Sequence, residues 1–179
     1  TGPTAIAYVP ITITNSKPDA TPAPFQQMIT VDSSTYAKYE QSGLQNIEFT
    51  TGPDAQGSTL PAWIETNASS SSTHTVVWVK LPNGIGASNT ITIYLDFMSA
   101  NVMSNSGPTG EAPQLSPKYA EYDNGGEVFN TYQNFAGTSC PSGWTCQSGV
   151  TIDNGTTISN SNIVSDSQYS PQVFDAYVL

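Results

Sequence analysis

The stretch from Thr73 to Phe97 constrains the fold more than any other part of the sequence, because apolar residues recur at every second position along both of its arms. A turn rich in Gly, Pro and Asn separates the two arms. Alternation of this kind is typical of strands with one buried face, so the stretch predicts a β-hairpin with a single aliphatic face. That face consists of Thr75, Val77, Val79, Leu81, Ile91, Ile93, Leu95 and Phe97.

The opposite face of this predicted hairpin carries Trp78 and Tyr94, where a solvated sheet usually shows small polar residues. If the strand that holds Trp63 is a neighbour, the three rings form one aromatic platform. Such rings stack on the C–H surfaces of sugars, and nearby carboxylates hydrogen-bond sugar hydroxyls. The alternative is that the segment 98–130 or another domain covers the rings. The candidate carbohydrate-binding residues are Trp63, Glu65, Trp78, Tyr94 and Asp96, with His74 at the rim.

Alternation elsewhere predicts four further strands, at about residues 6–15, 25–31, 44–50 and 60–65. Pro10 cannot donate a ladder hydrogen bond, so the first of these strands is expected at a sheet edge. Cap-forming residues at the start of 33–42 predict at most one short helix there. Six strands at roughly ten-residue spacing predict an all-β fold, an antiparallel β-sandwich of jelly-roll or immunoglobulin-like type.

The second half of the chain changes character after Phe97. We expect a β-sandwich domain over 1–97, a connector over 98–118, and further strands over 119–179 that either begin a jelly roll or complete the first sandwich. Asn154-Gly155 between alternating apolar residues predicts a two-residue hairpin turn. The apolar segment Val173 to Leu179 predicts a strand that pairs with a partner outside the chain, unless the chain is a fragment.

Composition excludes several partners. Of 179 residues only four are basic, Arg is absent, and the net charge is −10, so nucleic acid and anionic lipid are not expected as partners. No apolar run is long enough to cross a membrane. Cys140 and Cys146 predict one disulfide and an oxidising, extracellular compartment. Asn67 and Asn154 match the acceptor pattern for N-glycosylation.

An acidic turn is the one metal candidate. Oxygen-rich turns of this kind can hold Ca²⁺, although a solvated acidic turn is the simpler interpretation, and no other cofactor is expected. The residues are Glu121, Asp123, Asn124 and Glu127. The two cysteines lack the further soft ligands that zinc requires.

Catalytic chemistry finds little support in the sequence. His74 is the only histidine, and no nucleophile motif lies near it. A glycosidase needs two carboxylates that face one cleft, and Glu48, Glu65 and Asp96 are the candidates for such a pair. We therefore expect that the protein is not an enzyme.

Several segments resemble a known family. Tyr8–Asn15, Asn46–Thr50, Leu60–Glu65, Val76–Pro82 and Thr92–Asp96 are similar to the uncharacterised β-sandwich domain of bacterial and archaeal secreted proteins, and the Arg-free, Ser/Thr-rich style is similar to archaeal surface proteins. In that family the domain typically precedes a laminin-G or concanavalin-like jelly roll, whose opening Val128–Trp144 resembles. The resemblance implies an extracellular surface or adhesion role and supplies no catalytic residues.

The sequence thus predicts a non-enzymatic extracellular protein, a module or subunit of a cell-surface filament or adhesin. Pairing of strands with copies of itself or with neighbouring domains would assemble it, with Thr1–Asn15 or Val173–Leu179 donated to a neighbour. The alternative is a carbohydrate-binding module that uses the aromatic platform. The environment of Trp78 separates the two, since a covered ring favours the structural role and an open ring favours the binding role.

Overall fold

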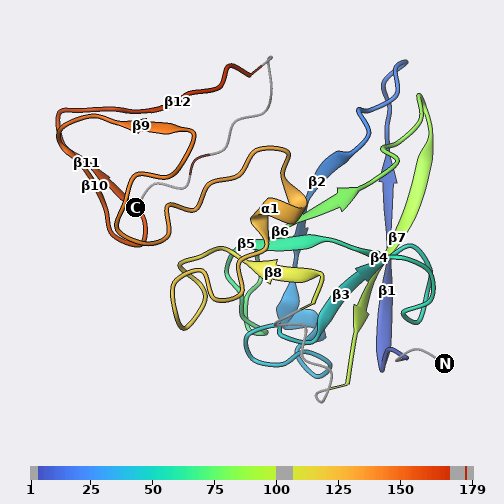
Figure 1. Ribbon diagram of the computed structural model, residues 1–179. Coiled ribbons are helices and arrows are strands. Elements are labelled where there is room, and N and C mark those ends of the chain that lie inside the picture. The colour runs from blue at the N-terminus through green and yellow to red at the C-terminus, as the bar shows by residue number, and fades with distance from the viewer. Residues whose placement is uncertain (1–3, 100–106, 170–175, 177–179) are drawn as a thin grey trace. The chain divides into compact units, whose positions relative to one another are not determined.

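The computed structural model describes residues 4–99, 107–169 and 176, and the chain divides into two compact units, Thr1–Gln133 and Asn134–Leu179 (Figure 1). Almost all of the regular structure is β-strand, as the sequence predicts. Within the described residues no helix is long and apolar enough to cross a membrane.

Two four-stranded sheets build the first unit. Sheet A has the strand order β1-β7-β3-β4 and is antiparallel throughout. Its strands are β1 (Ala7–Thr14), β7 (Thr90–Phe97), β3 (Ile47–Thr50) and β4 (Thr59–Leu60). Sheet B has the order β2-β6-β5-β8, in which β5 and β8 run parallel. Its strands are β2 (Phe25–Val31), β6 (Thr75–Leu81), β5 (Ala62–Thr66) and β8 (Thr109–Glu111).

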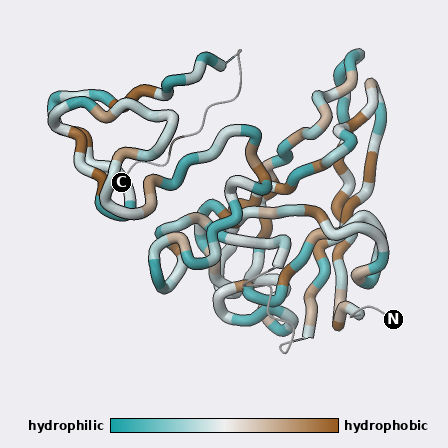
Figure 2. Tube along the Cα trace, in the orientation of Figure 1, coloured by the Kyte–Doolittle hydropathy of each residue, from teal (hydrophilic) through white to brown (hydrophobic). Residues whose placement is uncertain are grey.

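The two sheets pack face to face around one hydrophobic core. Alternation buries every second side chain of β6 in a strict pattern, and the inward residues Ile93, Leu95 and Phe97 of β7 are buried as well. Hydrophobic stretches recur along the strands of both sheets in Figure 2. The largest core side chains come from both sheets: Phe49, Leu60, Leu95 and Phe97 from sheet A, and Val77 and Val79 from sheet B. The predicted all-β sandwich is confirmed, but it is not antiparallel throughout as predicted, because β5 and β8 run parallel.

One topological prediction is wrong. β6 and β7 do not form a hairpin, because β6 lies in sheet B and β7 lies in sheet A. The connection 82–89 is longer than the two to five residues of most hairpin loops, and Ile85 within it is buried in the core. The two aliphatic faces therefore meet across the sandwich instead of forming one face.

The predicted edge strand is confirmed, and the predicted helix is shorter than expected. β1, which contains Pro10, is an edge strand as predicted, since β7 is its one neighbour in sheet A. The short helix expected near 33–42 is a 3-10 turn over Ser33–Tyr36. A second helical turn, α1 (Gly125–Val128), was not predicted.

The division of the chain also differs from the prediction. Residues 107–118, expected as a connector, include β8 of sheet B, and the first unit extends to Gln133 rather than ending at Phe97. Residues 100–106 of the predicted connector lie outside the described residues. The segment 107–133 is therefore part of the sandwich unit.

The second unit holds two small antiparallel sheets. β9 (Trp144–Cys146) pairs with β12 (Ile163–Ser165), and β10 (Val150–Ile152) pairs with β11 (Thr156–Ile158). Asn154 and Gly155 both have positive φ, but Ile152 pairs with Thr156, so the hairpin loop has one residue more than the predicted two. The predicted strand Val173–Leu179 lies outside the described residues except for Ala176.

Candidate functional site

An aromatic cluster occupies the outer face of sheet B. Trp63 and Trp78 are direct cross-strand partners on β5 and β6. The Phe129 ring meets the Trp63 ring edge-on at 5.3 Å between centroids and the Trp78 ring at 5.6 Å, and the Tyr132 ring lies 5.8 Å from Trp63. Trp63 is only 8% exposed. Residues of the segment 112–133, which we call the cover, therefore close this face.

Asp123 fixes the polar ends of the cluster. Its Oδ1 accepts hydrogen bonds from Trp63 Nε1 at 2.9 Å, from the Tyr132 hydroxyl at 2.9 Å and from the Gly125 backbone N–H at 3.0 Å. Burial, together with the negative charge of Asp123, raises the pKa of Tyr132 far above its usual value. The Tyr132 hydroxyl is thus a permanent donor, and the carboxylate satisfies the indole N–H of Trp63 inside the cluster.

Polar contacts also attach the cover to the strands beneath it. Lys80 Nζ donates to the Glu127 carbonyl at 2.8 Å, and Gln26 Nε2 donates to the Val128 carbonyl at 3.1 Å. Asn124 Nδ2 donates to the carbonyls of Ala62 and Pro108 at 2.9 and 2.8 Å. These contacts tie the cover to β2, β5 and β6.

Close approach of the cover requires glycine at two positions. A Cβ added to Gly110, on the outer face beside Trp63, would collide with the Asn124 side chain and the Tyr122 carbonyl. A Cβ added to Gly125 would collide with the Tyr132 ring. Gly110 therefore allows the cover to lie directly on the sheet, and Gly125 allows close packing within the cover.

The structure separates the residues of the predicted aromatic platform. Trp63, Glu65 and Trp78 lie on sheet B, where Glu65 Oε2 accepts a hydrogen bond from Trp78 Nε1 at 2.6 Å. Tyr94 and Asp96 lie on β7 of sheet A. The prediction of one platform is therefore wrong, because the two arms of the presumed hairpin belong to different sheets.

The outer face of sheet A contains a carboxylate pair instead. Glu48 and Asp96 are cross-strand partners, and Asp96 is 0% exposed, accepting from Thr50 Oγ1 at 2.6 Å and from the Ala55 N–H at 2.9 Å. Burial, and to a lesser degree the charge of Asp96, raises the pKa of Glu48. Glu65 lies on the other sheet, so the three carboxylates do not face one cleft.

The four residues of the acidic turn lie partly at the surface and partly against the sandwich. Glu121 and Glu127 are exposed, whereas Asp123 and Asn124 make the contacts with the sandwich described above. In the described parts of the chain, no three His, Cys, Asp or Glu side chains are grouped so that they could hold a metal ion. His74, expected at the platform rim, is exposed.

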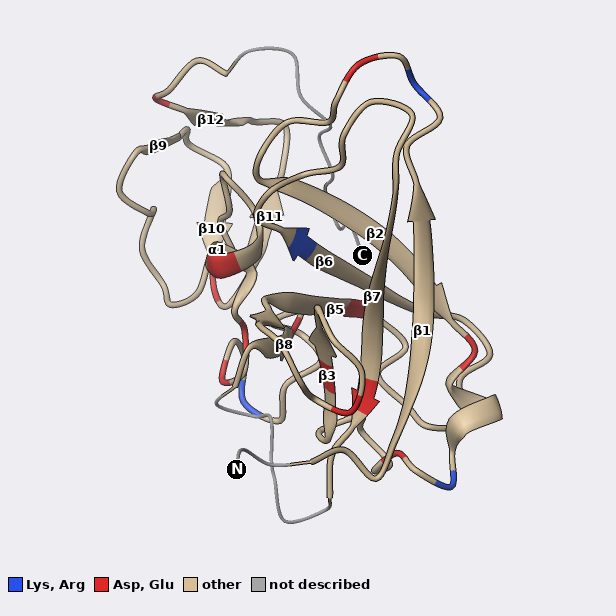
Figure 3. Cartoon of the chain, turned by 90° about the vertical axis from the view of Figure 1, so that its right-hand side faces the viewer, with Lys and Arg blue, Asp and Glu red and all other residues tan. Residues whose placement is uncertain are grey.

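Both sequon asparagines lie at the surface. Asn67 is exposed and its Nδ2 donates to the His74 carbonyl at 2.9 Å, while Asn154 is exposed and its Oδ1 accepts from the Gly137 N–H at 3.1 Å. Their glycosylation stays a prediction. The disulfide between Cys140 and Cys146 is confirmed. Figure 3 shows the basic residues separated from one another along the chain.

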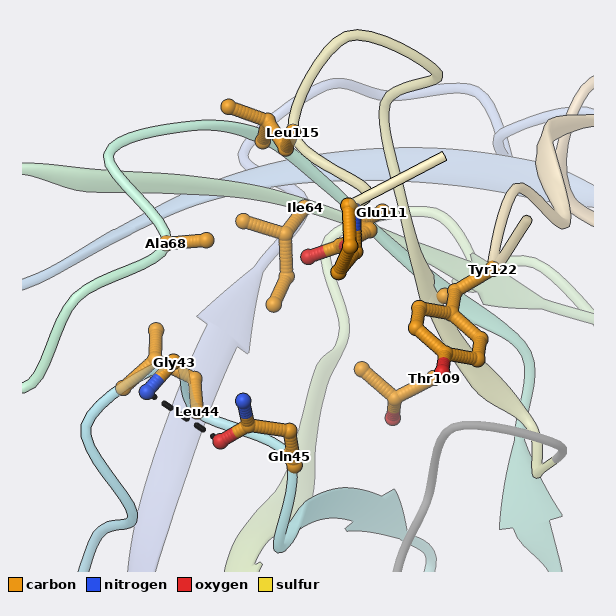
Figure 4. Close-up of a pocket in the computed structure, with 11 residues that line it drawn as sticks. Gly43, Leu44, Gln45, Ile64, Ala68, Thr109, Glu111, Leu115 and Tyr122 are labelled. Carbon is orange, nitrogen blue, oxygen red and sulfur yellow. Dashed lines mark hydrogen bonds between the residues drawn. The ribbon is translucent and has the colours of Figure 1, made fainter. Parts of the chain in front are cut away.

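A pocket of about 240 Å³ opens at the β8 end of the sandwich interior (Figure 4). Sequence reasoning missed it, because β8 is only three residues long and its loops carry no periodic pattern. Apolar and polar groups share its wall. The lining residues are Gly43, Leu44, Gln45, Ile64, Ala68, Thr109, Gly110, Glu111, Leu115, Pro117 and Tyr122.

Comparison with known proteins finds a family match for part of the chain. Residues 44–112 match the family described as a domain of unknown function (DUF2341). This span contains Trp63 and Trp78 but ends before the covering residues Phe129 and Tyr132.

A viral relative extends the comparison. The chain is 42% identical over 125 residues to "Uncharacterized protein 562" of Sulfolobus islandicus rod-shaped virus 1. The match covers 69% of this chain and 21% of the viral protein, so the chain spans about a fifth of the length of this curated relative. No solved structure matches the chain significantly.

Proposed function

We propose that the chain is a non-enzymatic structural or adhesive module of a larger extracellular surface protein, assembled through β-strand pairing. The observation that carries this proposal is the cover. The aromatic face of sheet B, which a carbohydrate platform would have to leave open, is packed by Phe129 and Tyr132. Rings that are packed by the same chain stabilise the fold and leave no open surface for a sugar, which favours a structural role.

Two further observations support the same role. The disulfide is typical of proteins from oxidising compartments, which include the cell exterior. The related viral protein is several times longer than the matched region, which suits a module within a larger chain. We also propose that this module precedes a jelly-roll domain.

The edge of β2 is the best candidate for strand pairing. Within the described residues, β2 has β6 as its one strand neighbour and contains no proline. Unpaired backbone groups along such an edge can add a strand from another chain. The expected donation of Thr1–Asn15 is not supported, because β1 pairs with β7 along its whole length. The predicted donor Val173–Leu179 lies outside the described residues except for Ala176.

Analytical ultracentrifugation over a range of concentrations tests this assembly. We expect concentration-dependent association of the full chain. Met28→Lys should abolish it, because Met28 lies on β2 with 48% of its surface exposed and a charge there opposes edge pairing. Thr12→Lys, at an exposed site on the proline-containing edge strand β1, is the matched control and should associate like the unaltered chain. A chain that is monomeric at every concentration, or equal behaviour of both variants, would contradict the proposal.

A further inference from the structure

We propose that the pocket beside β8 binds one neutral, polyhydroxylated ring, such as a single sugar residue of a glycan. This binding function is separate from the structural role of the module. The site shares no residue with the β2 edge and requires only the first unit.

The strand register explains why polar side chains line this end of the core. Thr109 pairs with Ala62, and Glu111 pairs with Ile64, in the parallel ladder of β5 and β8. Paired residues of neighbouring strands point to the same face of a sheet. Ala62 and Ile64 belong to the core, so Thr109 and Glu111 also face the interior between the two sheets.

The hydroxyl of Thr109 is the lining group that points most directly to a polar ligand. Thr109 is 5% exposed, and its Oγ1 has no hydrogen-bond partner among the described residues. Buried hydroxyls are almost always hydrogen-bonded, because leaving one unsatisfied is destabilising. Since Thr109 lines the pocket, a ligand there can supply the partner.

The other lining groups favour a hydroxylated ligand. Glu111 contributes a carboxyl group, and Gln45 contributes an amide whose Oε1 accepts from the Gly43 N–H at 3.1 Å. Figure 4 shows Gln45, Thr109, Glu111 and Tyr122 around the same space. A sugar hydroxyl can donate to the carboxyl group and accept from the threonine, whereas an ammonium group can only donate.

Charge and shape narrow the ligand further. Glu111 and the net charge of −10 disfavour anions. Leu44, Ile64 and Leu115, with the Tyr122 ring, supply apolar surface that suits the C–H face of a sugar ring. The volume lies below the roughly 300 Å³ at which pockets for drug-sized ligands begin, so one ring fits and an oligosaccharide does not.

Titration of the isotope-labelled full chain, followed by two-dimensional NMR, tests the site. The probes are glucose, mannose, galactose and N-acetylglucosamine, each alone, with methylammonium chloride as the charged alternative. We expect at least one sugar to bind with millimolar affinity and to shift the resonances of Thr109, Glu111 and Tyr122. Failure of all four sugars to shift these resonances, or a response to methylammonium alone, would overturn the proposal.

Variants connect the binding to the lining groups. Thr109→Val should weaken the best sugar about tenfold, while Tm stays equal or rises because a buried unpaired hydroxyl is removed. Thr92→Val, at an exposed position on β7, is the matched control and should bind normally. If Thr109→Val does not fold, Glu111→Gln, which keeps the size of the side chain, should weaken binding to a similar extent. Unchanged affinity in whichever of these two variants folds would refute the role of the pocket.

Discussion

The outer faces of sheet A and sheet B both carry aromatic residues, but only those of sheet B are covered by another segment of the described chain. On sheet B, Trp63 and Trp78 lie beneath Phe129 and Tyr132. On sheet A, the one ring contact of Tyr94 within the described residues is with Tyr8, at 5.9 Å between centroids, and Tyr8 remains 47% exposed. An outward aromatic residue therefore does not by itself indicate a binding surface.

Polar anchors explain the difference. The cover on sheet B is attached by Asp123, Asn124 and the backbone carbonyls that accept from Lys80 and Gln26. Sheet A buries its Asp96 under the short loop that contains Ala55. The two faces should therefore respond very differently to substitution.

The largest difference is expected from removal of one ring on each face. Trp63→Ala should lower the free energy of unfolding by about 3–5 kcal/mol, because it leaves a cavity under the cover and removes a partner of Asp123. Tyr94→Ala should lower it by about 1 kcal/mol or less, since that ring makes one edge contact. Urea denaturation followed by circular dichroism measures both values. Equal losses would show that sheet B is not more tightly covered than sheet A.

The carboxylates of the two faces provide the second comparison. Asp123→Asn should lower the free energy of unfolding by about 2 kcal/mol, because an NH2 group replaces the Oδ2 that accepts from the Tyr132 hydroxyl, and a neutral oxygen accepts more weakly from the Trp63 N–H. Asp96→Asn should lower it by only about 1 kcal/mol, since loss of its charge also relieves Glu48. The same denaturation assay applies, and a larger loss for Asp96→Asn would reverse the comparison.

Glu40 lies on neither outer face, and its titration should make the free energy of unfolding depend on pH. Burial raises its pKa from 4.5 to about 7, and the nearby Ser33 hydroxyl offsets part of the shift. The folded state therefore binds the proton more tightly than the unfolded state. Protonated Glu40 therefore stabilises the folded state relative to ionised Glu40. This contribution to the free energy of unfolding is complete below about pH 4.5 and is lost as the pH rises through about 7.

Glu40→Gln should flatten this pH profile. The part of the pH-dependent change in the free energy of unfolding that Glu40 causes is about 1–2 kcal/mol. It is no larger because the Glu40 side chain is only half buried, so solvent screens part of the electrostatic interaction. Unfolding free energies measured at several pH values from 4 to 8 give the slope for both proteins. A variant with the same slope as the unaltered chain would show that Glu40 does not titrate in this range.

The smallest expected effect comes from the acidic pair on sheet A. Glu48→Gln should raise the free energy of unfolding by about 0.5–1 kcal/mol at neutral pH, because it removes a half-buried charge beside Asp96. The gain should disappear in acid, where Glu48 is protonated. Glu65→Gln, on sheet B, is the control and should not stabilise, since Glu65 accepts from Trp78 Nε1. Stabilisation of both variants would indicate a general effect of net charge.

The alternation of residues predicted the strands well and their arrangement poorly. β6 and β7 begin and end close to the predicted positions, and Pro10 lies on an edge strand. The pattern says which side chains face the core, but not which sheet a strand joins. Long-range packing decides that choice, and here Ile85 in the connecting loop packs into the core.

The candidate sites show the same limit. Both cysteines pair as their spacing suggests, because that contact is local. The acidic pattern predicts Asp123 and Asn124 as calcium ligands, because the sequence does not show that they hydrogen-bond to the Trp63 indole and the Ala62 carbonyl, about sixty positions earlier. The pocket depends on the parallel register of β5 and β8, which no local pattern reports.

The position of the cover in the chain has a consequence for biosynthesis. During translation Trp63 and Trp78 leave the ribosome well before Phe129 and Tyr132, since domains emerge from their N-terminal end. Until the later residues are synthesised, the rings of Phe129 and Tyr132 cannot pack on the two indole rings. We expect this interval to be the time at which a nascent chain most needs a chaperone, and the arrival of Tyr132 to end that need.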